Sequence, residues 1–241
     1  MNQANKRNAI LEAEYRMAAH WAHPIRSAIE NNPRLAKQDE AWSKGSLSDR
    51  AFAIETRLTY LPRIIMFLDD NLKELNEELG RGTIAGTVSY HLSRGAAFAF
   101  SNDKAVQQVL FGATAFITES RSCFENLADF YRLFLEVYCN RTIKERDSYN
   151  VVAMSTGESA WADALRRIRG DLIHERSLFL AFDIREAGWP PIFSMNWRPG
   201  HFGPDDRIEL RTLVAIWEGL SQAAVAMQAK IVQIARQEAH D

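Results

Sequence analysis

The residues best suited to chemistry lie in one short stretch, residues 165–177, with the sequence LRRIRGDLIHERS. It contains four arginines, one histidine and two acids among leucine and isoleucine residues at helical spacing. Histidine changes its charge close to neutral pH, and arginine binds phosphate oxygens in a bidentate geometry. The stretch is therefore either a solvated helix face or a site for an anion such as a phosphate group.

Helical spacing distinguishes the arginines of this stretch from one another. Arg167 has Asp163 four residues before it and Asp171 four residues after it, so its own helix can neutralise it. Arg169 has apolar residues at both of these spacings and lies at the edge of an apolar stripe. A guanidinium in such a place needs a partner from another helix, from a second subunit or from a phosphate.

His174 follows Arg169 by five residues, which places it about 140° further round a straight helix. The two side chains therefore do not converge on one phosphate within a single helix. Two copies of the helix that meet across a symmetric dimer can form a shared cleft, to which each copy contributes both residues. Gly170 destabilises the helix by about 1 kcal/mol relative to alanine, but it permits close backbone approach.

The pattern of an arginine, four residues and a histidine, on a late helix that follows a long amphipathic one, resembles the signature of the HEPN superfamily (higher eukaryotes and prokaryotes nucleotide-binding domain). The resemblance covers about residues 101–240. Arg167 also fits the signature, with six residues before His174, and lies nearly on one stripe with it. We favour Arg169 as the motif arginine because no carboxylate on its own helix can pair with it.

The resemblance implies a metal-independent endoribonuclease that acts as a homodimer without a cofactor. His174 would act as general acid or base, and Arg169 would stabilise the phosphate in the transition state. Asp171 would orient one of these two groups. The RNA backbone would be steered by Arg166, Arg167 and Arg176.

The same resemblance implies partners and leaves a second function open. Active members often belong to toxin–antitoxin, phage-defence or CRISPR systems, so an antitoxin or a defence-system protein is an expected partner. Other members have lost catalysis and act as RNA-binding, protein-binding or scaffold domains. This non-catalytic alternative stays open from the sequence.

Composition and charge indicate which general class of protein this chain belongs to. Hydrophobic residues make up 46% and charged residues 25% of the 241-residue chain, which is typical of a soluble globular protein. The net charge of -2 means that any attraction to RNA must be local. No signal peptide begins the chain and no stretch approaches roughly 20 apolar residues, so we expect a cytoplasmic protein with no membrane partner.

Other catalytic and metal-binding signatures are absent from the sequence, including a glycine-rich phosphate loop and His-Glu-x-x-His. His20 and His23 lack a third ligand, so we predict no metal site. Cys123 and Cys139 are too far apart on one predicted helix for a disulfide. Residues 185–204 contain four of the seven prolines and several large aromatic residues. We expect the following aromatic residues to pin the segment to the core rather than stack on bases: Trp189, Trp197 and Phe202.

The hydrophobic pattern predicts an all-α fold, a helical bundle of four to five main helices. A first helix covers about residues 6–30 and is broken or kinked at Pro24. A second helix begins after GSLSD, with Ser46 or Ser48 as its cap, and ends near ELGRG. Pro62 is expected to kink this second helix.

The central helix is predicted to run from Ser101 or Asn102 to about Cys139, after an ambiguous segment over 83–100 that fits short strands or a weak helix. The stretch NRTIKERDSYN after it is polar and is expected to be an exposed connection.

The arginine–histidine helix is predicted over about 158–180. Prolines make 185–204 an irregular loop or short hairpin before the last helix, which begins at Asp205 or Asp206. We expect a single helical domain over 1–241, with 1–100 as an N-terminal helical extension and 101–241 as a HEPN-like bundle.

Overall fold

The computed structural model describes residues 20–38, 42, 46–80, 97–98, 104–174, 178–182, 191–194 and 207–238. The structure describes the backbone but not the side chains of 78–80, 97–98, 171–174 and 207. Several predictions therefore fall outside the described residues, among them those on 6–19, on most of 83–100, and on Arg176, Trp189, Trp197 and Phe202.

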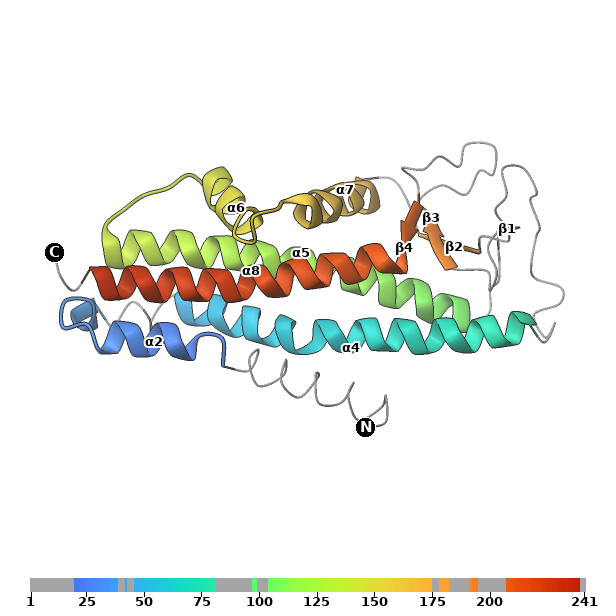
Figure 1. Ribbon diagram of the computed structural model, residues 1–241, viewed down its shortest axis with the longest axis horizontal. Coiled ribbons are helices and arrows are strands. Elements are labelled where there is room, and N and C mark those ends of the chain that lie inside the picture. The colour runs from blue at the N-terminus through green and yellow to red at the C-terminus, as the bar shows by residue number, and fades with distance from the viewer. Residues whose placement is uncertain are drawn as a thin grey trace. The chain divides into compact units, whose positions relative to one another are not determined.

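The protein is predominantly helical, which confirms the predicted all-α bundle (Figure 1). Its described helices are α2 (His23–Glu30), the short 3-10 helix η1 (Ala36–Gln38), α4 (Ser46–Gly80), α5 (Lys104–Cys139), α6 (Glu145–Ala153), α7 (Ala160–His174) and α8 (Leu210–Gln237). A small antiparallel sheet has the order β1-β2-β3-β4 and consists of β1 (Ala97–Phe98), β2 (Phe179–Phe182), β3 (Pro191–Ser194) and β4 (Arg207–Glu209).

The chain divides into two compact units, and the division falls inside α4, α5, α7 and α8. Each unit therefore combines residues from before and after residue 100. The first unit comprises Met1–Pro62, Glu119–Asp163 and Trp217–Asp241, and the second comprises Arg63–Thr118 and Ala164–Ile216. The prediction of a single domain over 1–241 stays a prediction.

Aromatic side chains fill the core of the first unit. The Phe130 ring of α5 contacts Trp21 and Trp42 edge-on, with ring centroids 5.2 Å and 5.9 Å away. The buried Trp21 indole donates a hydrogen bond from Nε1 to the Ala224 carbonyl of α8 at 2.7 Å. Because its one polar atom is satisfied, Trp21 can be almost fully buried and fix the start of α2 against α8.

Polar side chains join α4 to α5 within the first unit. Arg50 lies 3.2 Å from Asp129, and Arg57 Nε lies 3.0 Å from Glu119 Oε2. The Tyr60 hydroxyl donates to the same Glu119 oxygen at 2.8 Å. These contacts fix how the N-terminal half of α4 pairs with the C-terminal half of α5.

The sheet belongs to the second unit and corrects one prediction. Residues 179–182 form β2, where a helix was predicted to continue to about 180. They pair with β3 from Phe179↔Ser194 to Phe182↔Pro191, so one strand of this pair, β3, lies within the predicted irregular segment 185–204, and the other lies before it. A short apolar run such as FLAF fits either helix or strand by pattern alone, and its pairing partner decides between them.

The described part of the first predicted helix is interrupted next to Pro24, where a break or kink was predicted. Residues 20–22 form a turn, and α2 begins at His23 with Pro24 in its first turn, where a missing N–H costs no hydrogen bond. Two other predictions are wrong. The polar stretch after Cys139 contains α6, whose first turn carries Glu145 and Asp147 at the positive helix end. The last helix begins after β4, at Leu210. Helix α4 begins at Ser46, earlier than the predicted start after GSLSD, whereas the predicted end of α5 near Cys139 is confirmed.

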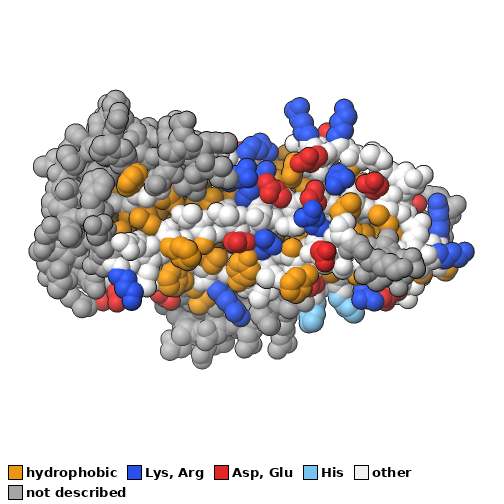
Figure 2. All heavy atoms as spheres, turned by 180° about the vertical axis from the view of Figure 1, so that it is seen from behind, with side chains coloured by type: hydrophobic (Ala, Val, Ile, Leu, Met, Phe, Trp, Pro, Cys, Tyr) orange, Lys and Arg blue, Asp and Glu red, His pale blue; other side chains and the backbone are white. Residues whose placement is uncertain are grey.

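Charged side chains of both signs are interspersed on the face drawn in Figure 2, and hydrophobic side chains form separate patches between them. None of the helices searched within the described part of the chain is long and apolar enough to cross a membrane.

Candidate functional site

Helix α7 carries the predicted site, and polar contacts of Ser159 stabilise the N-terminal end of this helix. The Ser159 hydroxyl donates to Asp163 Oδ2 at 3.0 Å, and the Ala162 backbone N–H donates to the Ser159 carbonyl at 2.9 Å. Ser159 thus stands directly before the first turn, a position that favours serine. The helix then buries Trp161, Leu165 and Ile168, as the predicted apolar stripe requires.

The buried stripe orients the remaining side chains of α7. At about 100° per residue, Gly170 points roughly opposite to the direction shared by Leu165 and Ile168. Arg169 lies about 100° from Gly170 on one side, and His174 lies about 40° from it on the other. Gly170 therefore lies on the outward face of the helix, between the positions of the two motif residues.

Arg169 is half-buried, which agrees with its predicted place at the edge of the apolar stripe. No described carboxylate pairs with it. Arg166 and Arg167 are exposed, and each makes an interaction with another group, as Asp163 also does.

The other predicted site residues lie at or beyond the end of the described helix. Asp171 and His174 belong to the last turn of α7 by their backbones, and their side chains are outside the description. Arg176 lies outside the described residues. The structure thus places Arg169 and the backbone of His174 on one helix, and the direction of the His174 side chain stays a prediction.

The surroundings of Gly170 differ from those of two other helical glycines. A Cβ on Gly112 would lie 2.9 Å from Leu68 Cδ2, and one on Gly219 would lie 2.2 Å from Trp161 Cγ. Packing inside the protein explains both of these glycines. A Cβ on Gly170 would meet no atom within 4 Å, so no described residue requires a glycine there by close packing.

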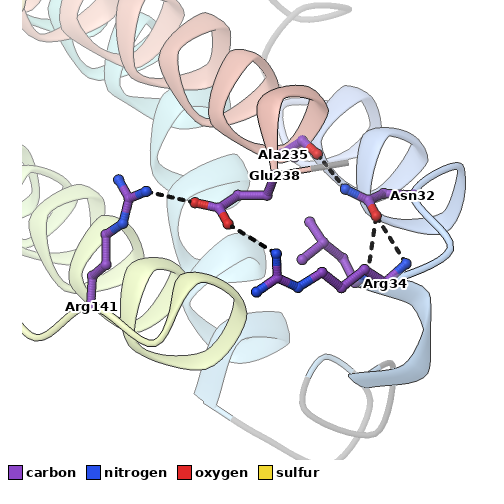
Figure 3. Close-up of polar contacts among 6 residues, drawn as sticks. Asn32, Arg34, Arg141, Ala235 and Glu238 are labelled. Atoms are coloured by element: carbon purple, nitrogen blue, oxygen red, sulfur yellow. Dashed lines mark hydrogen bonds and ion pairs between the residues drawn. The ribbon is translucent and has the colours of Figure 1, made fainter. Parts of the chain in front are cut away.

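A polar cluster at the end of α8 was not predicted from the sequence. Figure 3 shows the Glu238 carboxylate between two guanidinium groups, with Arg141 at 2.8 Å and Arg34 at 3.8 Å. A left-handed residue at the end of α5, Asn140 with φ 49°, directs the chain so that Arg141 reaches Glu238. The only signal in the sequence was the local positive charge at Arg141, because its partner lies 97 residues further along the chain.

Asn32 completes this cluster as a structural residue. Its Nδ2 donates to the Ala235 carbonyl at 2.7 Å, and its Oδ1 accepts the backbone N–H groups of Arg34 and Leu35 at 3.0 and 3.3 Å (Figure 3). Asn32 thereby satisfies a carbonyl near the end of α8 and shapes the turn before η1. Its polar atoms are occupied by the protein itself.

The two cysteines are unsuited to nucleophilic chemistry. Burial raises the pKa of the Cys123 thiol to about 12 and, with the nearby Glu238 carboxylate, that of the Cys139 thiol to about 11. Thiolates are the reactive form, so both side chains are inert at neutral pH. Both cysteines are free, which confirms the predicted absence of a disulfide between them.

No group of three or more His, Cys, Asp or Glu side chains within the described residues could hold a metal ion. The comparisons with family models, curated proteins and solved structures find no match for this chain.

Proposed function

We propose that this protein is a metal-independent endoribonuclease of the HEPN type that acts as a homodimer. Arg169 carries the proposal, because its half-buried guanidinium pairs with no described carboxylate and is suited to bind an anion. An RNA phosphate is such an anion, and His174 lies on the next turn of the same helix.

The proposed reaction moves the phosphorus from one ribose oxygen to another. The 2′-oxygen attacks the neighbouring phosphorus while its proton passes to a neutral histidine. The bond from phosphorus to the 5′-oxygen breaks, and this oxygen takes a proton from a protonated histidine. The products are a 2′,3′-cyclic phosphate and a 5′-hydroxyl, and Arg169 stabilises the negative charge that develops on the phosphate oxygens.

A second copy of α7 supplies the missing half of this site. Arg169 and His174 lie about 7.5 Å apart along the helix axis, on different sides of it. In an antiparallel pair of α7 helices that cross between these residues, Arg169 of each copy lies at the level of the partner's His174. Gly170 lies near such a crossing point on the outward face, where its missing side chain lets the two backbones approach.

The test is incubation of wild-type and His174→Ala protein with labelled single-stranded RNA in EDTA. We expect the wild type to leave 2′,3′-cyclic phosphate ends and the variant to lose about 10²–10⁴-fold in rate. His20→Ala is the matched control, because His20 is an exposed histidine of the first unit. RNA with 2′-O-methyl groups should resist cleavage, since it lacks the nucleophile.

Full activity of His174→Ala, with the fold confirmed by circular dichroism, would show that another residue is responsible. Cleavage that requires a divalent metal would exclude the proposed mechanism.

A non-catalytic role in binding or as a scaffold is the second candidate, and exposed aromatic side chains favour it. Phe111 of α5 is 74% exposed. Phe67 of α4 is 42% exposed, and its ring lies near Gly112, the residue after Phe111. Large exposed aromatic residues are typical of protein interfaces. Absence of cleavage by a folded dimer, together with loss of partner binding in Phe111→Ser, would favour this candidate over the ribonuclease.

A further inference from the structure

A hollow of about 590 Å³ opens beside α2 in the first unit, and none of the described residues that line it belongs to the proposed ribonuclease site. His23, Ser27 and Asn31 form one wall, because residues four apart lie on the same face of a helix. Arg236, in the last turn of α8, borders the hollow from the second helix. Its volume is within the range of small-molecule sites.

Arg236 is the one charged side chain among the described residues that line the hollow, and none of these residues is a carboxylate. Two described acids of α2 and of the end of α8 have arginine partners, since Glu30 pairs with Arg26 at 2.7 Å and Glu238 pairs with Arg141. Neither His23 nor Arg236 pairs with a carboxylate among the described residues.

The neutral side chains of the wall also present donors. Asn31 Nδ2 donates to Ser27 Oγ at 3.3 Å, so the Ser27 hydroxyl accepts this bond and keeps its own proton for a further acceptor. Pro24 and Ala28 add an apolar strip beside these groups. The wall therefore combines donors and a positive charge with a small apolar surface.

We propose that this hollow binds the phosphate group of a small phosphate ester or of an RNA 5′ end. The Arg236 guanidinium binds two phosphate oxygens, His23 and Ser27 donate to the others, and the ester's organic part lies along Pro24 and Ala28. The proposal does not rest on the proposed ribonuclease activity, because it concerns a different unit and a different set of residues.

The first experiment titrates adenosine monophosphate and inorganic phosphate into the full-length protein by calorimetry, with adenosine as the phosphate-free control. We expect both phosphates to bind competitively and adenosine not to bind. Arg236→Gln should weaken phosphate binding by about tenfold or more, and His23→Gln by a few-fold, since hydrogen bonds to charged groups are lost. Both residues are exposed, so the variants should fold.

The matched control is Arg26→Gln, which removes an arginine of the same helix that is already paired with Glu30. It should leave phosphate binding unchanged. Failure of both phosphates to saturate the protein, or equal weakening by Arg26→Gln and Arg236→Gln, would overturn the proposal.

Two further ligands distinguish the sources of the phosphate. A 2′-O-methyl RNA that carries a 5′-phosphate is compared with the same RNA that ends in a 5′-hydroxyl, and neither can be cleaved through its 2′-oxygen. Stronger displacement of adenosine monophosphate by the phosphorylated RNA assigns the hollow to RNA ends. Equal, weak displacement by both assigns it to a small ester. Because binding is measured without cleavage, an inactive protein would not affect either outcome.

Discussion

At the end of α8 two arginines share one buried carboxylate, whereas near the end of α7 Arg169 has no described carboxylate partner. Two glycines show the same difference between a residue that contacts the protein and one that does not. Gly219 is required by the Trp161 ring that packs on it, and Gly170 faces open space. Polar groups and glycines that the protein itself satisfies have a structural role. Arg169 and Gly170 have no such partner among the described residues, which is why α7 is the better candidate for a site.

The largest expected effect tests this contrast within α7. Arg169→Ala should lower the rate of RNA cleavage by about 10²–10³-fold, because it removes the group that stabilises the transition-state charge. Arg167→Ala should change the rate by only a few-fold, since Arg167 is an exposed steering residue. Rates of cyclic phosphate formation at equal concentrations of folded protein decide between them. The reverse order would make Arg167 the motif arginine.

Alanine at the two contrasting glycines should change stability in opposite directions. Gly219→Ala should lower the free energy of unfolding by about 1–3 kcal/mol, because the new methyl group collides with Trp161. Gly170→Ala should raise it by up to about 1 kcal/mol through helix propensity. Urea unfolding of the two variants measures both effects.

The same Gly170→Ala change should act differently on the dimer. A methyl group at the proposed crossing point overpacks it and weakens self-association by roughly tenfold. Sedimentation at several concentrations measures this. A variant that is more stable and dimerises as well as the wild type would remove Gly170 from the proposed interface.

The ion pairs of the first unit give a smaller effect. Glu238→Gln should lower the free energy of unfolding by about 1 kcal/mol, because it removes a buried charge shared by two arginines that are themselves largely exposed. Glu30→Gln should lower it by less than about 0.5 kcal/mol, since its pair with Arg26 is exposed on both sides. Thermal unfolding of the two variants compares them, and equal losses would show that burial of Glu238 contributes nothing.

The smallest effect is a dependence of stability on alkaline pH. Burial, with the hydrogen bond to Glu119, raises the pKa of Tyr60 from 10.0 to about 12. Between these values the unfolded chain has lost a proton that the folded protein keeps, so the free energy of unfolding falls as the pH rises. The stabilisation is complete below pH 10. Tyr60→Phe should reduce this slope in urea unfolding at pH 9 to 11, and an unchanged slope would contradict the assignment.

The sequence predicted the helices whose apolar residues recur at helical spacing. The end of α5 near Cys139 and the buried stripe of α7 follow from residues that are close in the chain. The candidate site was predictable for the same reason, because the spacing of Arg169, its apolar neighbours and His174 is a local property. The positions of Asp171 and His174 side chains in that site are still predictions.

The boundaries that were wrong share one cause. Residues 179–182 became a strand because they pair with β3 and with β1, and β1 is more than 80 residues earlier in the chain. The helix α6 packs its Tyr149 ring against Phe124 of α5 at 5.6 Å between centroids, a contact that the polar sequence around it did not indicate. In both cases a distant segment supplied the surface that stabilised the local structure.

The sequence by itself determined that this protein is helical, which faces of its helices are apolar, and which arginine of α7 lacks a partner on its own helix. Only the tertiary structure decided which polar groups are satisfied. Glu238 finds Arg141 and Arg34 from distant parts of the chain, and Gly219 is required by a tryptophan 58 residues away. The physical reason is that helix formation depends on neighbours within about four residues, whereas ion pairing, close packing and an anion-binding hollow depend on residues that only folding brings together.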